Sequence, residues 1–217
     1  MNGPTTQESP ILPIYLVLDE GYLLQDEKVL IALTEFLRHL AQSDQTVRVS
    51  RLATVTFSDG ITLHAALQPP SADMLPYANQ FPGPTSHDAL LDYLPQLIEH
   101  DLHWFKEQNT PTLRPFLMLL SASTDVLSGA STKLFDPEWK YRPNVYLLRA
   151  NPEAAPSDQE ILIVFAATPE VKGADPSKPI DAAANAIIDA CVATNSGNPT
   201  AFRFPHVIPG WIIGQGV

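Results

Sequence analysis

Two histidines, His100 and His103, have a spacing that metal ligands use. They lie three residues apart in a stretch with helical periodicity, which brings both rings to one helix face. Imidazole nitrogen is a common zinc ligand, so a zinc site is one hypothesis. The sequence offers no identifiable third ligand, and Glu99 and Asp101 beside the histidines are typical of a solvated face. We expect solvated side chains here rather than zinc.

Other reactive side chains also have structural explanations. His87, Asp88 and Asp92 form an acidic patch at helical spacing, where Asp88 suits the positive end of a helix dipole. Cys191 falls in the apolar stripe of a predicted helix and is expected to be a buried, inert thiol. A single cysteine permits no internal disulfide and no cysteine-ligated zinc site, which favours a reducing, cytoplasmic location.

Charge and composition exclude several partners. The 217 residues include 24 acidic and 13 basic side chains, a net charge of −11 that repels phosphate backbones, so we expect no nucleic-acid partner. No apolar run has the length of a membrane span, and residues 1–9 lack the Lys and Arg of a signal peptide. The sequence also lacks a Gly-x-Ser-x-Gly elbow, a phosphate-binding glycine loop with lysine and a dinucleotide-binding fingerprint.

The elements that position these residues follow from hydrophobic periodicity. Continuous apolar runs predict strands buried on both faces, and a Ser58-Asp59-Gly60 turn predicts an antiparallel hairpin. The predicted strands are 14–18, 47–57, 61–67, 116–120, 144–150 and 161–167, and the predicted helices are 29–40, 85–105 and 181–194. This order predicts an α/β, Rossmann-like open sheet, mostly parallel with one antiparallel edge strand and helices on both faces.

One domain accounts for nearly the whole chain in this interpretation. Residues 1–10 are expected to be a disordered tail, 11–217 a single domain, and 202–217 a docked C-terminal tail. In an open α/β sheet, function concentrates in the loops that leave the carboxyl ends of the strands. Three loops therefore matter: the loop after Leu18, the loop around Thr85 and the loop after Leu120.

Four segments near these loops resemble a von Willebrand factor A domain, in particular the small stand-alone bacterial kind found near tellurium-resistance genes. Leu12–Asp19 resembles the family's first strand with its terminal acid, and Val55–Gly60 resembles its hairpin. Gly83–Leu90 resembles its Gly-Gly-Thr-Ser loop, and Arg114–Ser121 resembles its fourth strand. The resemblance covers roughly residues 12–150 and implies a binding module with this fold.

The resemblance also implies a metal-ion-dependent adhesion site in a degenerate form. The family takes Asp-x-Ser-x-Ser after its first strand, a Thr from the middle loop and an Asp after the fourth strand. Asp19 and Thr85 match, whereas the two serine positions are Gly21 and Leu23 and the second acid position falls on Ala122. Mg²⁺ needs about six oxygen ligands, so we expect a vestigial site without a cofactor. Asp125 or Glu20 as substitute ligands keep a Mg²⁺ site as an alternative.

The function expected from these residues is non-catalytic protein binding in the cytoplasm. Apolar and aromatic anchors often dominate binding energy, and a partner-binding rim is predicted at the strand ends, made of Glu20, Tyr22, Leu23, Leu24, Phe81, Ser86, Ser121, Ser123 and Asp125. The alternative is a Mg²⁺-dependent phosphatase that uses Asp19, since Asp19 and Ser121 also resemble two motifs of the haloacid-dehalogenase phosphatases. Those enzymes need a second acid where this chain has Gly21.

The segment 121–143 is predicted to be an irregular crossover with at most one or two helical turns. Prolines and a glycine interrupt any helix, and its serines and threonines compete for backbone hydrogen bonds. Phe135 and Trp139 are expected to pin the segment to the sheet, and its length makes it a candidate specificity element.

Overall fold

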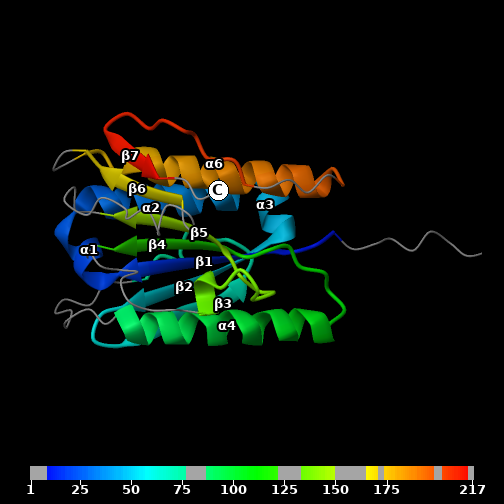
Figure 1. Cartoon of the computed structure of the whole chain (residues 1–217). Helices are drawn as coiled ribbons and strands as arrows, with labels where there is room; N and C mark the ends of the chain where they lie inside the picture. The colour runs from blue at the N-terminus through cyan, green and yellow to red at the C-terminus, as the bar shows by residue number, and fades with distance from the viewer. Residues whose placement is uncertain are drawn as a thin grey trace, which may run out of the picture.

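A computed structural model describes residues 9–76, 87–121, 133–149, 165–170, 174–197 and 202–214. Its centre is a seven-stranded sheet with strand order β3-β2-β1-β4-β5-β6-β7 (Figure 1). The strands are β1 Leu12–Asp19, β2 Ser50–Phe57, β3 Ile61–Gln68, β4 Phe116–Ser121, β5 Asn144–Arg149, β6 Phe165–Pro169 and β7 Trp211–Gly214. The helices are α1 Glu20–Gln25, α2 Glu27–Gln42, α3 Asp44–Val49, α4 His87–Glu107 and α6 Ser177–Asn195, with a 3-10 turn η1 Lys133–Phe135.

Five neighbouring strands of the sheet run parallel. β1 pairs in parallel with β2 and β4, and β5 pairs in parallel with β4 and β6. At one edge β3 pairs antiparallel with β2, as the Ser58-Asp59-Gly60 turn predicts. The predicted fold class is therefore confirmed. The structure adds a second antiparallel edge strand, because β7 pairs with β6 at the other end of the sheet.

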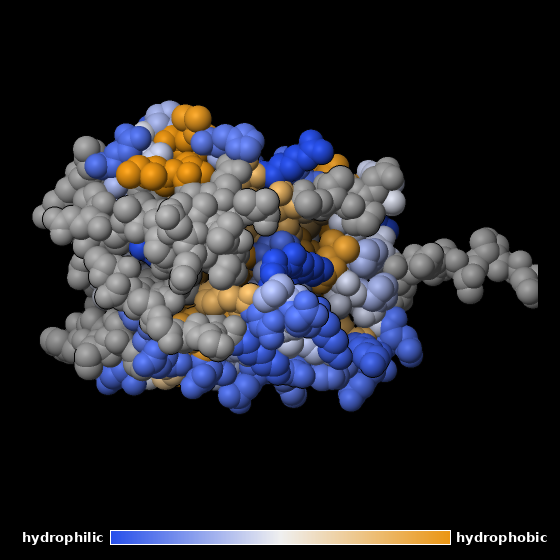
Figure 2. Space-filling model, in the orientation of Figure 1, coloured by the Kyte–Doolittle hydropathy of each residue, from blue (hydrophilic) through white to orange (hydrophobic). Residues whose placement is uncertain are grey.

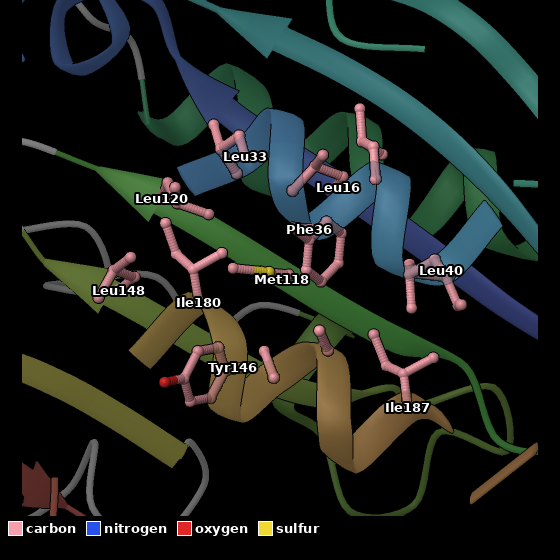
Figure 3. Close-up of a cluster of buried hydrophobic side chains, with 14 of the residues drawn as sticks. Leu16, Leu33, Phe36, Leu40, Met118, Leu120, Tyr146, Leu148, Ile180 and Ile187 are labelled. Atoms are coloured by element: carbon pink, nitrogen blue, oxygen red, sulfur yellow. The ribbon is translucent and has the colours of Figure 1, made fainter. Parts of the chain in front are cut away.

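Helices cover both faces of the sheet (Figure 1). α2 and α6 lie together on one face, where Leu33 and Phe36 of α2 and Ile180 and Ile187 of α6 share one buried cluster with Met118 of β4 (Figure 3). α4 covers the other face with buried side chains that include Leu90, Leu94 and Ile98. Strand β1 is buried at every position because it lies between these two cores.

Besides β7, two parts of the sequence form elements that the sequence analysis did not predict. The predicted strand 47–57 is wrong at its start, because Asp44–Val49 forms α3 and β2 begins only at Ser50. The hydroxyl of Ser43 accepts a hydrogen bond from Thr46 N at 3.3 Å and caps α3, which packs beside α6. This cap and packing outweigh the strand preference of the β-branched residues. The short helix α1, directly after β1, was not predicted either.

The described part of the predicted crossover, residues 133–143, agrees with the expectation. It contains a single 3-10 turn, and Trp139 is buried in the core under α4 with Phe135 packed beside it. Residues 122–132 lie outside the described part of the chain.

Candidate functional site

Three buried polar or charged residues end neighbouring parallel strands, and a histidine lies beside them. Asp19 ends β1, Ser121 ends β4 and Arg149 ends β5, and all three are buried. Leu18 pairs with Leu120 and Ser121 pairs with Arg149, so the three side chains are level across the sheet. Because strand side chains alternate between faces, all three lie on the face that α4 covers. His87, the first residue of α4, joins them.

Both carboxylate oxygens of Asp19 accept hydrogen bonds from the protein. Oδ1 accepts from Gly21 N at 3.0 Å, the N-cap contact of α1, and Oδ2 accepts from the Ser121 hydroxyl at 3.2 Å. Asp19 is only 2% exposed, and these bonds compensate for its burial. A Cβ on Gly21 would lie 3.3 Å from Asp19 Oδ1, so a serine at this position would crowd the carboxylate.

A second hydrogen bond of Ser121, to His87, determines which group donates and which accepts in a short chain of hydrogen bonds. His87 Nε2 lies 3.3 Å from Ser121 Oγ. An ionised carboxylate only accepts, so the Ser121 hydroxyl gives its hydrogen to Asp19 and accepts from His87. The His87 ring also packs edge-on against Phe57, with ring centroids 5.6 Å apart. The order is His87 to Ser121 to Asp19, which differs from the nucleophilic order in which histidine accepts the serine hydrogen.

A second polar network surrounds Glu20, the next residue in the chain. Glu20 is 7% exposed, and its two oxygens accept from the Thr56 hydroxyl at 2.9 Å and the Ser58 hydroxyl at 3.2 Å. His64 Nε2 of β3 lies 2.8 Å from Thr56 Oγ1. Burial lowers the pKa of His64, and the negative charge of Glu20 partly opposes that effect. This network ties α1 to the hairpin of β2 and β3.

The structure places only some of the predicted site residues together. It joins Asp19 to Ser121, but Thr85, Phe81, Ser86, Ser123 and Asp125 lie outside the described residues. Leu23 and Leu24 belong to α1, and the structure does not describe their side chains.

Three rim predictions need correction, because Glu20, Tyr22 and Ser121 are all buried. Hydroxyl groups of the hairpin hold Glu20, Tyr22 packs into the core beside α2, and Ser121 donates to Asp19. Burial raises the pKa of Tyr22 well above its ordinary value, with a smaller contribution from the charge of Asp26.

The sequence analysis missed Arg149, Thr56 and His64. Arg149 could have been found, because it is a charged residue at the end of an apolar strand. The pairing of His64 with Thr56 depends on strand register, which spacing alone does not reveal.

The zinc hypothesis for His100 and His103 gains no third ligand. His103 Nδ1 lies 2.9 Å from the Glu99 carbonyl oxygen, and its Nε2 lies 3.2 Å from the Tyr141 hydroxyl. Across the described residues, no group of three or more His, Cys, Asp and Glu side chains is arranged to hold a metal ion. Cys191 is buried as predicted, and burial raises the pKa of its thiol to about 12.

Comparison with solved structures identifies the fold as that of von Willebrand factor A domains. A von Willebrand factor type A protein from Catenulispora acidiphila superposes with a TM-score of 0.52 at 10% identity, covering 85% of this chain and 43% of that one. The proximal thread matrix protein 1 of the mussel byssus, whose metal-ion-dependent adhesion site holds zinc, gives a TM-score of 0.50 at 14% identity, covering 84% and 46%. This chain thus spans less than half the length of either protein. No protein-family model and no curated protein sequence matches it.

Proposed function

We propose that this chain is a non-catalytic protein-interaction module with a degenerate metal site. The observation that carries the proposal is the hydrogen bonding of Asp19, since both of its oxygens already accept from Gly21 N and the Ser121 hydroxyl. A cation at Asp19 would compete with these donors for the carboxylate and would still need a shell of about six oxygens. Gly21 supplies no side-chain oxygen where the family has serine.

The charge at the strand ends supports the same proposal. Arg149 is buried one strand from Ser121 and two strands from Asp19, which corresponds to backbone separations of ~5 and ~10 Å. A positive charge at a nearby strand end disfavours a divalent cation there. A rim without a metal would bind its partner through side chains alone.

The phosphatase alternative receives no support from the fold comparison or from the site. Its second acid would have to stand at Gly21, and the Ser121 hydroxyl directs its hydrogen to Asp19. Among the described residues, no helix has the length and apolar character to cross a membrane. We further propose a cytoplasmic protein partner, as the resemblance to the tellurium-resistance-associated domains implies.

Affinity capture from the native cell, with and without chelator, tests this function. Leu24→Asp and Phe81→Asp place a charge at the predicted rim, and Trp104→Asp is the matched control. Trp104 is 54% exposed and lies near the C-terminal end of α4, far from the strand ends that adjoin its N-terminus (Figure 1). We expect the rim variants to lose the partner, the control to retain it, and chelator to have no effect. Partner loss with chelator would refute a metal-free interface.

A further inference from the structure

A cavity of about 400 Å³ lies on the sheet beside the edge strand β3. Its polar lining comes from Thr54, His64, Gln68 and Asp73, and Met74 and Leu75 contribute apolar surface. We call this space the edge cavity. It falls in the size range of pockets that bind small ligands, and no part of the strand-end site described above contributes to its lining except the ring of His64.

Irregular pairing of β3 turns His64 toward this cavity. Thr54 pairs with Ala65 and Val55 pairs with Leu63, so one step along β2 corresponds to two steps along β3. His64 is the extra residue of this β-bulge. A bulge re-aims a side chain relative to regular pairing, and here it brings the ring to Thr56 and to the wall of the edge cavity.

The hydrogen bonds around Thr56 determine which nitrogen of the His64 ring can accept a hydrogen bond. The Thr56 hydroxyl donates its only hydrogen to Glu20, so Thr56 Oγ1 accepts from His64 Nε2. Nδ1 is then the acceptor nitrogen of the neutral ring. The lowered pKa of His64 agrees with a neutral ring near pH 7.

The other polar groups of the edge cavity also favour a ligand that donates hydrogen bonds or carries a positive charge. The Asp73 carboxylate accepts from the Ser71 hydroxyl, and this bond lowers the pKa of Asp73. Thr54 Oγ1 is buried and has no hydrogen-bond partner among the described residues. None of the described residues that line the cavity is a lysine or an arginine. The cavity therefore offers acceptors and a negative charge without a compensating positive charge.

We propose that the edge cavity binds an alkyl cation, that is, an ammonium or guanidinium group on a short aliphatic stem. The Asp73 carboxylate and His64 Nδ1 would accept hydrogen bonds from the cation, and Met74 and Leu75 would contact the stem. The ligand has two sources, a free amine or guanidine and a basic side chain of a protein partner. This inference does not depend on the proposed function of the strand-end rim.

Titration of the isotope-labelled 217-residue chain with butylguanidinium, followed by amide chemical shifts, tests the proposal. We expect saturable shifts at residues 64–68 and 71–75. 1-Butanol, which has the stem without charge, should bind about tenfold more weakly, and butyrate should not bind. Absence of saturable shifts, or equal binding of butanol and butylguanidinium, would overturn the proposal.

Two variants locate the binding groups. Asp73→Asn should weaken butylguanidinium binding about tenfold, whereas Asp44→Asn, an exposed acid in the first turn of α3, should leave it unchanged. Thr54→Val removes a buried hydroxyl without changing shape, so the fold should remain intact while binding weakens. Unchanged binding in both cavity variants would overturn the assignment.

A capped arginine peptide distinguishes the two sources. If N-acetyl-arginine N-methylamide binds at least as tightly as butylguanidinium, the cavity accommodates a basic side chain attached to a backbone. If only the free cation binds, the natural ligand is a small amine or guanidine. Both outcomes support the alkyl-cation site.

Discussion

Asp19 and Glu20 are adjacent in the chain, yet they connect different parts of the molecule. Asp19 accepts from Ser121 of β4 and from the backbone of α1, so it links the centre of the sheet to the helix that follows β1. Glu20 accepts from Thr56 and Ser58 at the end of β2. Both carboxylates are buried, and in both cases hydroxyl groups compensate for the loss of water.

The difference between the two residues lies in what else each supports. Asp19 is also the N-cap of α1, whereas Glu20 holds a hydroxyl that in turn accepts from a histidine at the sheet edge. Asp19 is therefore expected to matter more for stability, and Glu20 more for the position of the hairpin and its edge cavity.

The largest effect is expected for Asp19→Ala. This change removes a helix cap and the acceptor of the buried Ser121 hydroxyl, so we expect a loss of about 2–3 kcal/mol in the free energy of unfolding. Urea denaturation measures it. Asp26→Ala is the matched control, because Asp26 caps α2 through a solvent-exposed hydrogen bond of 2.9 Å from Lys28 N, and the change should cost only ~1 kcal/mol. Equal losses in the two variants would contradict a special role for the Asp19 contact with β4.

A smaller effect is expected for Glu20→Ala. The hydroxyls of Thr56 and Ser58 lose their shared acceptor, which should cost about 1–2 kcal/mol in the same measurement. Glu20→Gln keeps an amide oxygen for one of the two hydroxyls and should lose less. If Glu20→Ala were as stable as the parent chain, the network that joins α1 to the hairpin would contribute nothing to folding.

The Glu20 network should also make stability depend on pH through His64. The pKa of this ring is lowered in the folded state, so below the unfolded value of about 6.5 the unfolded chain binds a proton that the folded chain does not. Folding stability should therefore fall as pH decreases through that value.

His64→Gln isolates this contribution, because the amide can still donate to Thr56 without titrating. The decrease in melting temperature between pH 7.5 and pH 5.5 should be smaller in His64→Gln than in the parent chain. The difference should be small, since His64 is only partly shielded from solvent, which screens its charge. A larger decrease in the variant would reverse the sign and contradict the prediction.

The smallest effect is expected at Asp19 for a divalent ion. The melting temperature should be the same in millimolar Mg²⁺ and in excess chelator, because the carboxylate oxygens already bind protein donors. An ion that binds the folded state stabilises it by mass action. A reproducible rise with Mg²⁺ that disappears in Asp19→Ala would restore the Mg²⁺ alternative.

The two edges of the sheet also differ, since one exposes hydrophobic side chains and the other carries an irregular strand. Figure 2 shows hydrophilic residues over α4 and a gathering of hydrophobic residues near β7. Ile212 of β7 is exposed, as is Val207, which precedes β7 in the chain. At the opposite edge, β3 carries two irregularities of register, which twist an edge strand away from pairing with another chain.

Much of the fold follows from local sequence patterns. The apolar run 14–18 and the stripe 29–40 predict β1 and α2, because burial on both faces or on one helix face leaves a distinct periodicity. The turn Ser58-Asp59-Gly60 predicts the antiparallel β3. Helix α3 could not be predicted in this way, since Val47 and Val49 favour a strand and only the Ser43 cap and contact with α6 decide for a helix.

The sequence by itself determined the order of the main strands and helices, without α1, α3 and β7, and placed Asp19 at the end of a buried strand. Only the tertiary structure decided what Asp19 and Glu20 bind. Ser121 lies 102 positions from Asp19, and Thr56 lies 36 positions from Glu20, so strand order and register bring them together. The bulge at His64 depends on the same register. Local periodicity carries no information on these pairings, because they arise from the packing of distant segments rather than from neighbouring residues.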